Sequence, residues 1–436
     1  PRFVWFLEAG EQLAPDAARL LAVAGVDADV VYSDHDSLDP VAGHVDPWFV
    51  PDWSPYRLLS QDYVDGAFAV RDGHRLREAF ARLPSSVGAP AWRYGLLLAV
   101  SSTGAKVVHV PRVLWSRPRD RSPVDEVAAV RAVEATLARR GAAGADVQPV
   151  ESSAAPARRI DWPAPESAMT VSVIVPTTGR PDLAEGLVRM LQRTAYEPLE
   201  VIVLDNGRGR HPDGIDLLRE SLPTVITVDE PFDWARLSNI GAGHASGDML
   251  LFLNDDMEVI DEDWLHPLVR LAARPDVGAV GPLLLYPDGM IQHAGIILVG
   301  HGGGAAHLFA ELDPSDDLYL DQHRITREVS ALTGACLLVS RDVFHEVGGF
   351  DERFVVSGND TDFCLRVRET GRLNLWTPDS KLIHHEGRSR RGVAYLGDES
   401  RLWDSWSGRL KAGDPYFNPN LAQDRLDCSL DASRLR

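Results

Sequence analysis

Apolar runs separated by segments of helical periodicity recur through the second half of the chain. Residues 171–177, 199–205 and 248–253 are apolar runs of strand length, and residues 181–194 and 235–245 have the pattern of helices. Continuous rather than alternating apolar strands indicate a sheet covered on both faces, and strands that alternate with helices usually pair in parallel. The pattern therefore predicts an α/β domain with a parallel sheet between two helical layers.

Polar residues follow each of these three strands directly. Thr177 and Asp205 close the first two, and Asp255 and Asp256 follow the third within GDMLLFLNDDMEVI (247–260). Ligands bind at the carboxyl ends of such strands, and a carboxylate there is costly to desolvate unless a cation meets it. One acid could be a polar turn, but two adjacent acids favour a Mg²⁺ or Mn²⁺ site that bridges to substrate phosphates.

The loop after the first strand, VPTTGRPD (175–182), is predicted to lie against a nucleotide. It contains neither G-x-G-x-x-G nor G-x-x-x-x-G-K-[ST], which argues against a dinucleotide fold and excludes a P-loop. Asp205 lies in VLDNG, where Asp-Asn-Gly is also a turn signal. A turn role and a contact with a base or ribose remain equally open for this acid.

Two acids stand at the start of a later predicted helix, GNDTDFCLRVRETG (358–371). Asp360 and Asp362 suit the helix dipole and the free N–H groups there, which is a sufficient structural role for one of them. The other could act as a general base facing a cleft. Upstream, the small residues around Thr333 and Gly334 would let a substrate approach the backbone.

A histidine pair follows another short strand, and basic residues come after it. Neutral imidazole from His384 or His385 could complete a metal shell near the two carboxylates. Arg388, Arg390 and Arg391 form a small basic cluster in an acidic chain. They are either a solvated loop or a means of neutralising a phosphate.

The first half repeats part of the second half weakly. When the Thr-Gly stops at Gly104 and Gly371 are superposed, Arg93 falls opposite Asp360 and Arg117 opposite His384. The first half is therefore expected to share the fold without the chemistry.

Bulk composition limits the possible functions. The chain has 436 residues, 44% of them apolar, and a net charge of −20. This length predicts two domains, and the charge argues against nucleic-acid binding. Three cysteines lack metal-ligand spacing and are expected to be reduced, and no run has the length of a membrane span or the form of a signal peptide. The chain opens without Met inside a predicted strand, as an excised piece of a longer protein would.

Together these motifs resemble the family-2 glycosyltransferases, which have the GT-A fold. The likeness covers about residues 170–392, from VSVIVPTTGRPDL through RLSNIGAGHASGDMLLFLNDD and SALTGACLLVSRDVFHEVGGFDERF to NDTDFCLRVRETG and HHEG. The nearest resemblance is to large bacterial enzymes of rhamnan, O-antigen or galactofuranan synthesis, which often carry two such modules in tandem. The implied fold is a Rossmann-like, mixed and mostly parallel sheet with helices on both faces.

The resemblance and the composition together suggest domain boundaries. Residues 1–149 are expected to form a truncated, degenerate GT-A-like module that ends in a helix over residues 122–140, and 150–169, rich in Ala, Pro and Ser, a linker. Residues 170–395 are expected to be the catalytic GT-A domain. Residues 396–436 are expected to form a tail that packs on it.

The resemblance also implies roles, residue by residue. Asp360 matches the base that deprotonates the acceptor, and Asp256 with His384 matches the metal ligands, with His385 as the alternative. Donor and nucleotide contacts are implied for Pro176, Thr177, Arg180, Asp205, Asn239, Asn254 and Asp255. Acceptor contacts are implied for Thr333, Gly334, Asn359 and Asp362. One departure is that the family's common Glu-Asp pair is Asn359-Asp360 here.

The implied activity is transfer of a sugar from a nucleotide diphosphate, with Mn²⁺ or Mg²⁺ and with inversion. dTDP-rhamnose and UDP-galactofuranose are plausible donors, and the acceptor would be a glycan or a lipid-linked molecule. The implied location is the cytoplasm, and a lipid-linked acceptor would place the enzyme peripherally at the inner face of the membrane. A non-catalytic nucleotide-sugar or glycan-binding module is the alternative. A nucleotidyltransferase is a weaker one, because PTTGRPD is a poor match to its signature.

The first module is expected to be inactive. Glu8 and Glu11 only partly replace the acid motif, and arginines stand at the base and histidine positions. Its aromatic residues could stack on sugars, although packing in the core is the simpler interpretation for most of them. These residues are Trp48, Trp53, Tyr56 and Tyr63.

Overall fold

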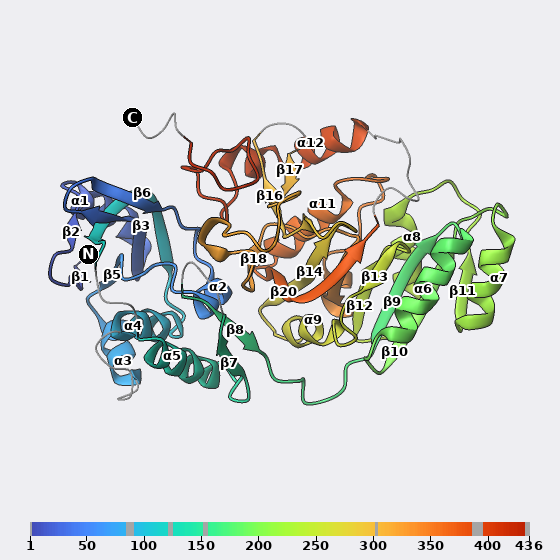
Figure 1. The fold of residues 1–436 in the computed structure, drawn as a ribbon, viewed down its shortest axis with the longest axis horizontal. Coiled ribbons are helices and arrows are strands. Elements are labelled where there is room, and N and C mark those ends of the chain that lie inside the picture. Colours follow the sequence, from blue (N-terminus) through green and yellow to red (C-terminus); the bar gives the residue numbers. More distant parts are fainter. Residues whose placement is uncertain are drawn as a thin grey trace.

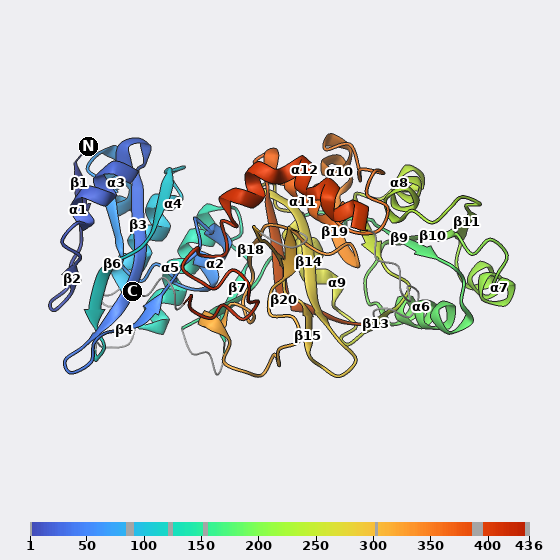
Figure 2. The ribbon, with the colours of Figure 1, turned by 90° about the horizontal axis from the view of Figure 1, so that it is seen from above.

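A computed structural model describes residues 2–83, 91–120, 125–150, 156–300, 304–385 and 396–431. Figure 1 shows two β-sheets along the long axis of the molecule, with the first part of the chain at one end. Figure 2 shows helices on both sides of the second sheet.

The second sheet has ten strands and is mixed. Its main path runs in the order β11-β10-β9-β12-β19-β14-β20-β13. The first four strands are parallel neighbours, whereas β19 is antiparallel to both β12 and β14. The predicted α/β class and mixed sheet are therefore confirmed. In path order the bounds are Thr224–Thr227, Leu199–Asp205, Val171–Thr177, Met249–Leu253, Cys336–Ser340, Val277–Leu285, Leu373–His384 and Met257–Val259.

Helices bury both faces of this sheet, which explains its continuous apolar strands. In β12, Leu251 and Leu253 pack on one side, and Leu250 and Phe252 pack on the other. The first side is covered by α6 (Pro181–Arg193), α7 (Pro212–Ser221) and α9 (Leu265–Ala272). The second is covered by α8 (Trp234–His244), α10 (Arg341–Glu346) and α11 (Asn359–Glu369).

The first sheet has six strands and repeats the distal part of the second. Its path is β1-β5-β3-β6-β2, and β4 pairs with β3. The run β1-β5-β3-β6 has the same order and relative directions as β12-β19-β14-β20. The internal repeat seen in the sequence thus has a structural counterpart. The bounds from β1 to β6 are Phe3–Trp5, Gln12–Leu13, Val30–Asp39, Gly43–Trp48, Phe68–Arg71 and Val107–Pro118.

Helices α1 (Ala17–Ala24), α3 (His74–Arg82), α4 (Trp92–Ser101) and α5 (Glu126–Arg139) belong to this first part. Asp125 caps α5 by accepting a hydrogen bond from the Ala128 N–H at 3.2 Å. The helix was expected to begin at Ser122, which lies outside the described residues.

One apolar cluster continues from the first sheet to the second. Within the expected linker, β8 (Arg158–Asp161) pairs with β7 (Asp146–Pro149), so this segment also contains ordered sheet. Across the junction, Glu328 on β18 (Arg327–Val329) accepts the backbone N–H groups of Tyr56 at 2.6 Å and Arg57 at 3.1 Å. Burial raises the pKa of Glu328 to about 7. This carboxyl holds the start of α2 (Pro55–Ser60) against the second sheet.

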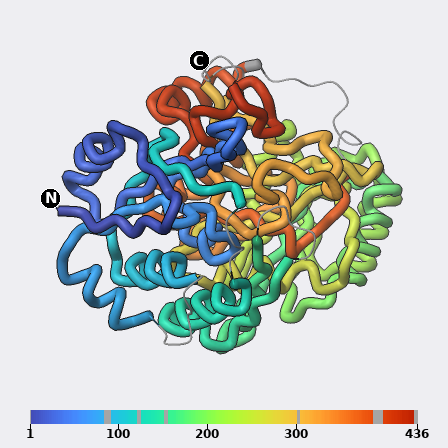
Figure 3. Tube along the Cα trace, turned by 60° about the vertical axis from the view of Figure 1, so that its left-hand side comes forward, coloured from blue at the N-terminus to red at the C-terminus, as the bar shows by residue number. Residues whose placement is uncertain are grey.

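The tail after α12 (Leu396–Ala412) returns to the first sheet, which Figure 3 shows where red and blue segments meet. Asn418 donates from Nδ2 to Asp34 Oδ1 at 2.9 Å and to the Val50 carbonyl at 2.8 Å, and Asn420 donates to Asp34 Oδ2 at 3.2 Å. The tail was expected to pack on the catalytic domain, yet it also binds the first part. The Asp34 carboxylate is buried and both of its oxygens require hydrogen-bond donors, which the tail supplies.

Cys336, Cys364 and Cys428 are free and buried, and burial raises the pKa of each thiol. Among the described residues, no helix is both long and apolar enough to cross a bilayer.

Asn418→Ala is expected to lower the free energy of unfolding by about 3 kcal/mol, because Asp34 and the Val50 carbonyl both lose a buried donor. Chemical denaturation measures this. Asp424→Ala, at an exposed position of the same tail, is the matched control and should change stability by less than about 0.5 kcal/mol. Equal stabilities for the two variants would contradict this role of the tail.

Candidate active site

Three of the predicted site residues converge at the carboxyl edge of the second sheet. Thr177 and Asp205 are register partners on β9 and β10, and Asp255 follows the neighbouring β12. The Thr177 hydroxyl donates to Asp255 Oδ2 at 2.6 Å and accepts from the Gly179 N–H at 3.0 Å. Thr177 and Asp255 are both buried, so one hydroxyl couples the nucleotide loop to the acid motif.

Asp205 has the turn role that its Asp-Asn-Gly context indicated. Its carboxylate accepts hydrogen bonds from the Gly207 N–H at 2.9 Å and the Thr227 hydroxyl at 3.1 Å. Arg219 lies 3.6 Å from Oδ2. These contacts fix the carboxylate at the end of β10, next to Thr177, and the turn role is compatible with a nucleotide contact.

Asp256 and His384 meet although they are far apart in the sequence. Strand β13 pairs with β20 so that Met257 lies opposite His384. This places His384 Nε2 3.0 Å from Asp256 Oδ1. On the other side of the ring, His384 Nδ1 lies 2.7 Å from Gln292 Oε1.

A chain of hydrogen bonds fixes the tautomer of His384. The indole N–H of Trp234 can only donate, and it lies 3.4 Å from Asn254 Oδ1. The Asn254 amide nitrogen therefore faces His384, and it donates to Nε2 at 3.2 Å. Gln292 Oε1 can only accept, so Nδ1 carries a proton, and the Nε2 lone pair accepts the Asn254 N–H.

The Asp256–His384 pair fits a divalent cation. Nε2 and the carboxylate oxygen lie 3.0 Å apart, so one divalent cation could bind both, taking the place of the Asn254 N–H on the Nε2 lone pair. Bonds of about 2.1 Å at right angles, as in an octahedral shell, place two ligand atoms about 3 Å apart. In the described part of the chain, no three potential ligand side chains converge. Further coordination would therefore fall to substrate oxygens and water.

The predicted base, Asp360, is oriented by the backbone of the preceding loop. Its Oδ2 accepts from the Gly334 N–H at 2.9 Å, and Oδ1 accepts from the Thr361 N–H at 2.7 Å. A Cβ at Gly334 would lie 2.8 Å from the Trp234 ring, so this position requires glycine. The next residue accepts the Asn254 N–H at its carbonyl, which ties this loop to the acid motif.

Asn359 is buried, and its side-chain oxygen accepts the Asp360 N–H at 2.7 Å. Within the described residues its amide nitrogen has no hydrogen-bond acceptor. Thr333 is half-buried and accepts the Ala335 N–H at 3.3 Å. Thr333 in the loop and Asn359 at the start of α11 lie beside the base, and acceptor contact by them stays a prediction.

Two residues assigned to the site use their polar atoms in hydrogen bonds to other parts of the chain. Asn239 uses both ends of its amide on the backbone of Phe350 and the carboxylate of Glu352. Asp362 accepts from Trp406 Nε1 and Arg366 Nε, each at 2.8 Å. Neither donor contact by Asn239 nor acceptor contact by Asp362 agrees with this bonding, because their polar atoms hold distant segments together.

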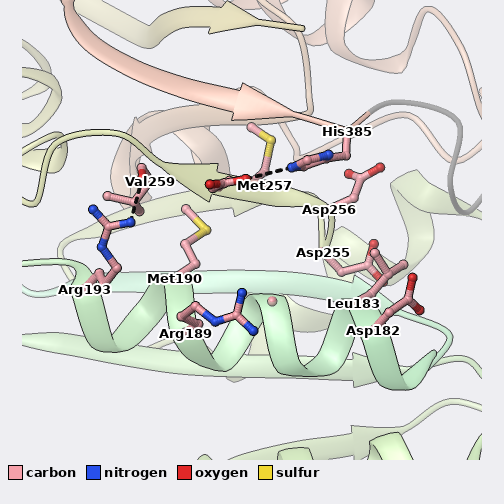
Figure 4. A pocket seen from close by; sticks show the side chains of 12 residues that line it. Asp182, Leu183, Arg189, Met190, Arg193, Asp255, Asp256, Met257, Val259 and His385 are labelled. Atoms are coloured by element: carbon pink, nitrogen blue, oxygen red, sulfur yellow. Dashed lines mark hydrogen bonds and ion pairs between the residues drawn. The ribbon is translucent and has the colours of Figure 1, made fainter. Parts of the chain in front are cut away.

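His385 lines the same cavity as Asp256, but its ring is bound by another acid. It pairs with Glu258 at 2.9 Å, as Figure 4 shows, while its backbone N–H bonds to the Asp256 carbonyl. His384 is therefore the better candidate ligand. Arg180 precedes α6 and pairs with Asp182 at 2.7 Å. The cluster Arg388, Arg390 and Arg391 lies outside the described residues.

Some residues of the site were missed in the sequence. Trp234 and Gln292 were not assigned, although Gln292 lies within the motif PDGMIQHAG that carried the resemblance. A cavity of about 190 Å³ also opens between α6 and β13, and Arg189 lines it together with Asp255 and Asp256 (Figure 4). An apolar-helix pattern alone gives no signal for such an arginine.

The corresponding region of the first part is closed by internal ion pairs. Arg93, at the second position of α4 as Asp360 is in α11, binds Glu11 at 2.8 and 2.9 Å and lies 3.3 Å from Glu8. Arg117 on β6 pairs with Asp65.

The aromatic residues of the first part differ in exposure. Tyr56 and Tyr63 are buried, which agrees with a packing role, and Trp48 and Trp53 pack partly against the same core.

Comparison with known proteins identifies the family. The model of glycosyl transferase family 2 matches residues 172–348. An N-acetylglucosaminyl-diphospho-decaprenol L-rhamnosyltransferase of Mycobacterium tuberculosis is 32% identical over 47% of this chain and 72% of its own length. The chain belongs to glycosyltransferase family 2. The resemblance that its motifs indicated is thus confirmed.

Two further relatives of this family-2 chain match nearly all of it. The O-antigen biosynthesis protein RfbC of Myxococcus xanthus is 37% identical over 98% of the chain, and the uncharacterized protein y4gI of Sinorhizobium fredii is 32% identical over 99%. The chain spans only 34% of RfbC and 50% of y4gI.

Two solved glycosyltransferases resemble the structure in part. GalNAc-T7 with UDP, GalNAc and Mn²⁺ gives a TM-score of 0.44 at 18% identity, over 57% of this chain and 50% of its own. The mannosyltransferase PcManGT of Pyrobaculum calidifontis, with GDP-Man and Mn²⁺, gives 0.42 at 20% identity, over 59% and 69%.

Thr177→Val is expected to weaken binding of a nucleotide diphosphate about tenfold, because Asp255 loses its buried hydroxyl donor. Titration calorimetry with UDP and dTDP in Mn²⁺ measures this. Thr177→Ser keeps the hydroxyl and should bind as the wild type does. Equal binding by the Val and Ser variants would exclude this role of the hydroxyl.

Proposed function

We propose that the chain is a metal-dependent, inverting glycosyltransferase that uses a nucleotide-diphosphate sugar. The observation that carries this proposal is the Asp256–His384 pair, which is next to Asp255 and joined through Asn254 to the loop that orients Asp360. A cation site and a base held by one hydrogen-bonded frame are what single displacement at a sugar requires. Family membership supports the same reaction class.

Asp256 and His384 would hold Mn²⁺ or Mg²⁺. When bound, the cation would supply charge neutralisation for the diphosphate and stabilise the leaving group. Trp234, Asn254 and Gln292 hold the His384 ring so that Nε2 faces Asp256. A bound cation would replace the Asn254 N–H as the partner of Nε2.

Thr177 and Asp205 would hold the nucleotide, and Pro176 and Arg180 flank that loop. Asp255 would contact the sugar or ribose. Asp360 would remove the acceptor hydroxyl proton as that oxygen attacks the anomeric carbon, and the nucleotide diphosphate departs from the opposite face with the bonding pair. Attack opposite the leaving group inverts the anomeric configuration.

The relatives support a role in bacterial cell-surface polysaccharide synthesis. One is named for O-antigen biosynthesis and another for rhamnosyl transfer to a diphospho-decaprenol acceptor. A dTDP-rhamnose or UDP-galactofuranose donor and a glycan or lipid-linked acceptor suit such a role. A lipid-linked acceptor would bring the chain to the inner face of the membrane.

A non-catalytic nucleotide-sugar or glycan-binding module is the second candidate. Asn359, where the family commonly has an acid, and the arginines of the first part favour it. A nucleotidyltransferase lacks support in the nucleotide loop and in the family match.

Incubation with a panel of nucleotide sugars is expected to release one nucleotide diphosphate in the presence of Mn²⁺ or Mg²⁺. EDTA should reduce the release about a hundredfold or more, because the leaving diphosphate loses its counter-charge. Chromatography of the nucleotides measures both. Binding of no donor, with or without metal, would remove Asp255, Asp256 and His384 from the proposed site.

Asp360→Asn is expected to lower transfer by about 10² to 10⁴-fold, because an amide cannot accept the acceptor proton. Donor affinity should stay within about twofold, since the base contacts the acceptor side. Initial rates and donor titrations measure these separately. Asp342→Asn, at an exposed acid in the first turn of α10, is the control. A binding module would show no turnover in any of these proteins.

A further inference from the structure

Helix α12 lies over the start of α11, the helix that carries Asp360 (Figure 1). Two of its side chains bind the segment 356–362, one on each side of Asp360. The contacts join residues more than 40 positions apart in the sequence. They are therefore a product of tertiary packing and not of local turn formation.

Asp398 makes the first contact. This residue is fully buried, and its Oδ2 accepts the backbone N–H groups of Val356 at 3.0 Å and Ser357 at 3.2 Å. Its Oδ1 accepts from Arg401 at 2.9 Å. A buried carboxylate with three donors is held firmly, because losing any one of them leaves charge unsatisfied. Asp398 thus fixes the backbone just before α11.

Trp406 makes the second contact. It leaves helical geometry with φ −124° and ψ 17°, and its indole N–H donates to Asp362 Oδ1 at 2.8 Å. The other oxygen of Asp362 accepts from Arg366, which also donates to the carbonyls of Val347 and Gly349. Trp406 therefore completes a network that anchors the first turn of α11.

The residues between these two contacts include no strand. Gly358 precedes α11 with φ +74°, a left-handed conformation that favours glycine, and a Cβ there would lie 3.7 Å from Leu402 of α12. Leu402 is buried against this turn. Residues 356–358 precede the helix, so the side-chain contacts from α12 help to set where α11 begins. The position of Asp360 is thus set jointly by the Gly334 N–H and by α12.

We propose that Asp398 and Trp406 are positioning residues for Asp360, so that α12 is a working part of the active site. This inference rests on the proposed function for its effect on catalysis. Neither residue contacts donor or acceptor in the proposed arrangement. Both act by holding segment 356–362 in the geometry that lets the Asp360 carboxylate reach the acceptor hydroxyl.

Trp406→Phe removes the indole N–H and keeps an aromatic ring in the same cluster. The expected result is a fall of about tenfold or more in kcat for transfer, because a small displacement of the base from the acceptor hydroxyl raises the barrier to reaction. Donor Kd and donor KM should stay within about twofold, since the metal and nucleotide contacts are untouched. Steady-state kinetics and calorimetry with the donor that the panel identifies measure these quantities.

Trp403→Phe is the matched control. Trp403 lies on the same helix and packs against the same cluster of Leu298, Leu365 and Leu410. Its substitution should leave kcat within about twofold of the wild type. Equal loss of kcat in the two variants, or a parallel loss of donor binding in Trp406→Phe, would overturn the proposal, because either result indicates general destabilisation.

Amide hydrogen exchange tests the same proposal without the reaction. Asp398→Ala should speed exchange of the Val356 and Ser357 amides about tenfold or more, because each loses its acceptor. Trp406→Phe should speed exchange in the first turn of α11, and Trp403→Phe should do neither. Unchanged exchange in the first two variants would overturn the proposal. If the wild type transfers no sugar, the proposed function fails while this measurement still decides whether α12 holds the segment.

Discussion

Everything at the proposed site follows from the burial of carboxylates at one edge of a sheet. Asp205, Asp255 and Asp256 lie at the ends of two strands, and each has only 5–6% of its surface exposed. Ionised groups at such positions need compensating donors or cations. The Thr177 hydroxyl meets this requirement for Asp255, and the turn after Asp205 meets it for Asp205. At Asp256, which lies 3.0 Å from His384 Nε2, a divalent cation would supply the counter-charge.

The two halves of the chain balance their carboxylate charges in different ways. Both halves have acids after a strand. At the second position of the corresponding helix, however, the first half has Arg93 in α4 and the second half has Asp360 in α11. The Arg93 guanidinium, paired with Glu11, is always charged and already balances this carboxylate. A bound metal ion is therefore not needed there. In the second half, the counter-charge beside Asp256 and His384 would be a divalent cation that arrives with the substrate.

Long-range hydrogen bonds connect the acid motif, the Gly334 loop and the segment before α11. Trp234 joins three of its parts, because its indole binds Asn254, its ring packs on Gly334 and its backbone N–H binds the Val355 carbonyl. From there α12 holds the base segment, and the tail beyond α12 binds the first sheet through Asp34. The first half is thus connected to the base through packing, although its own site is closed.

The sequence by itself determined the sheet, the helices and the convergence of strand-end residues. Continuous apolar strands predicted burial on both faces, and parallel pairing of adjacent strands places Thr177, Asp205 and Asp255 on one edge, since parallel strands end together. These features depend on local patterns that repeat within a few residues, and they can be read without coordinates. The family followed from the same motifs.

Only the tertiary structure decided which polar side chains are available to a ligand. Asn239 and Asp362 resemble site residues in sequence, but segments 44 to 113 positions away occupy their polar atoms. Gln292 gave no signal, because its role exists only when β15 (Ile291–His293) brings it to His384. Hydrogen bonds are short and directional, so a partner distant in the chain can redirect a side chain without leaving a local pattern.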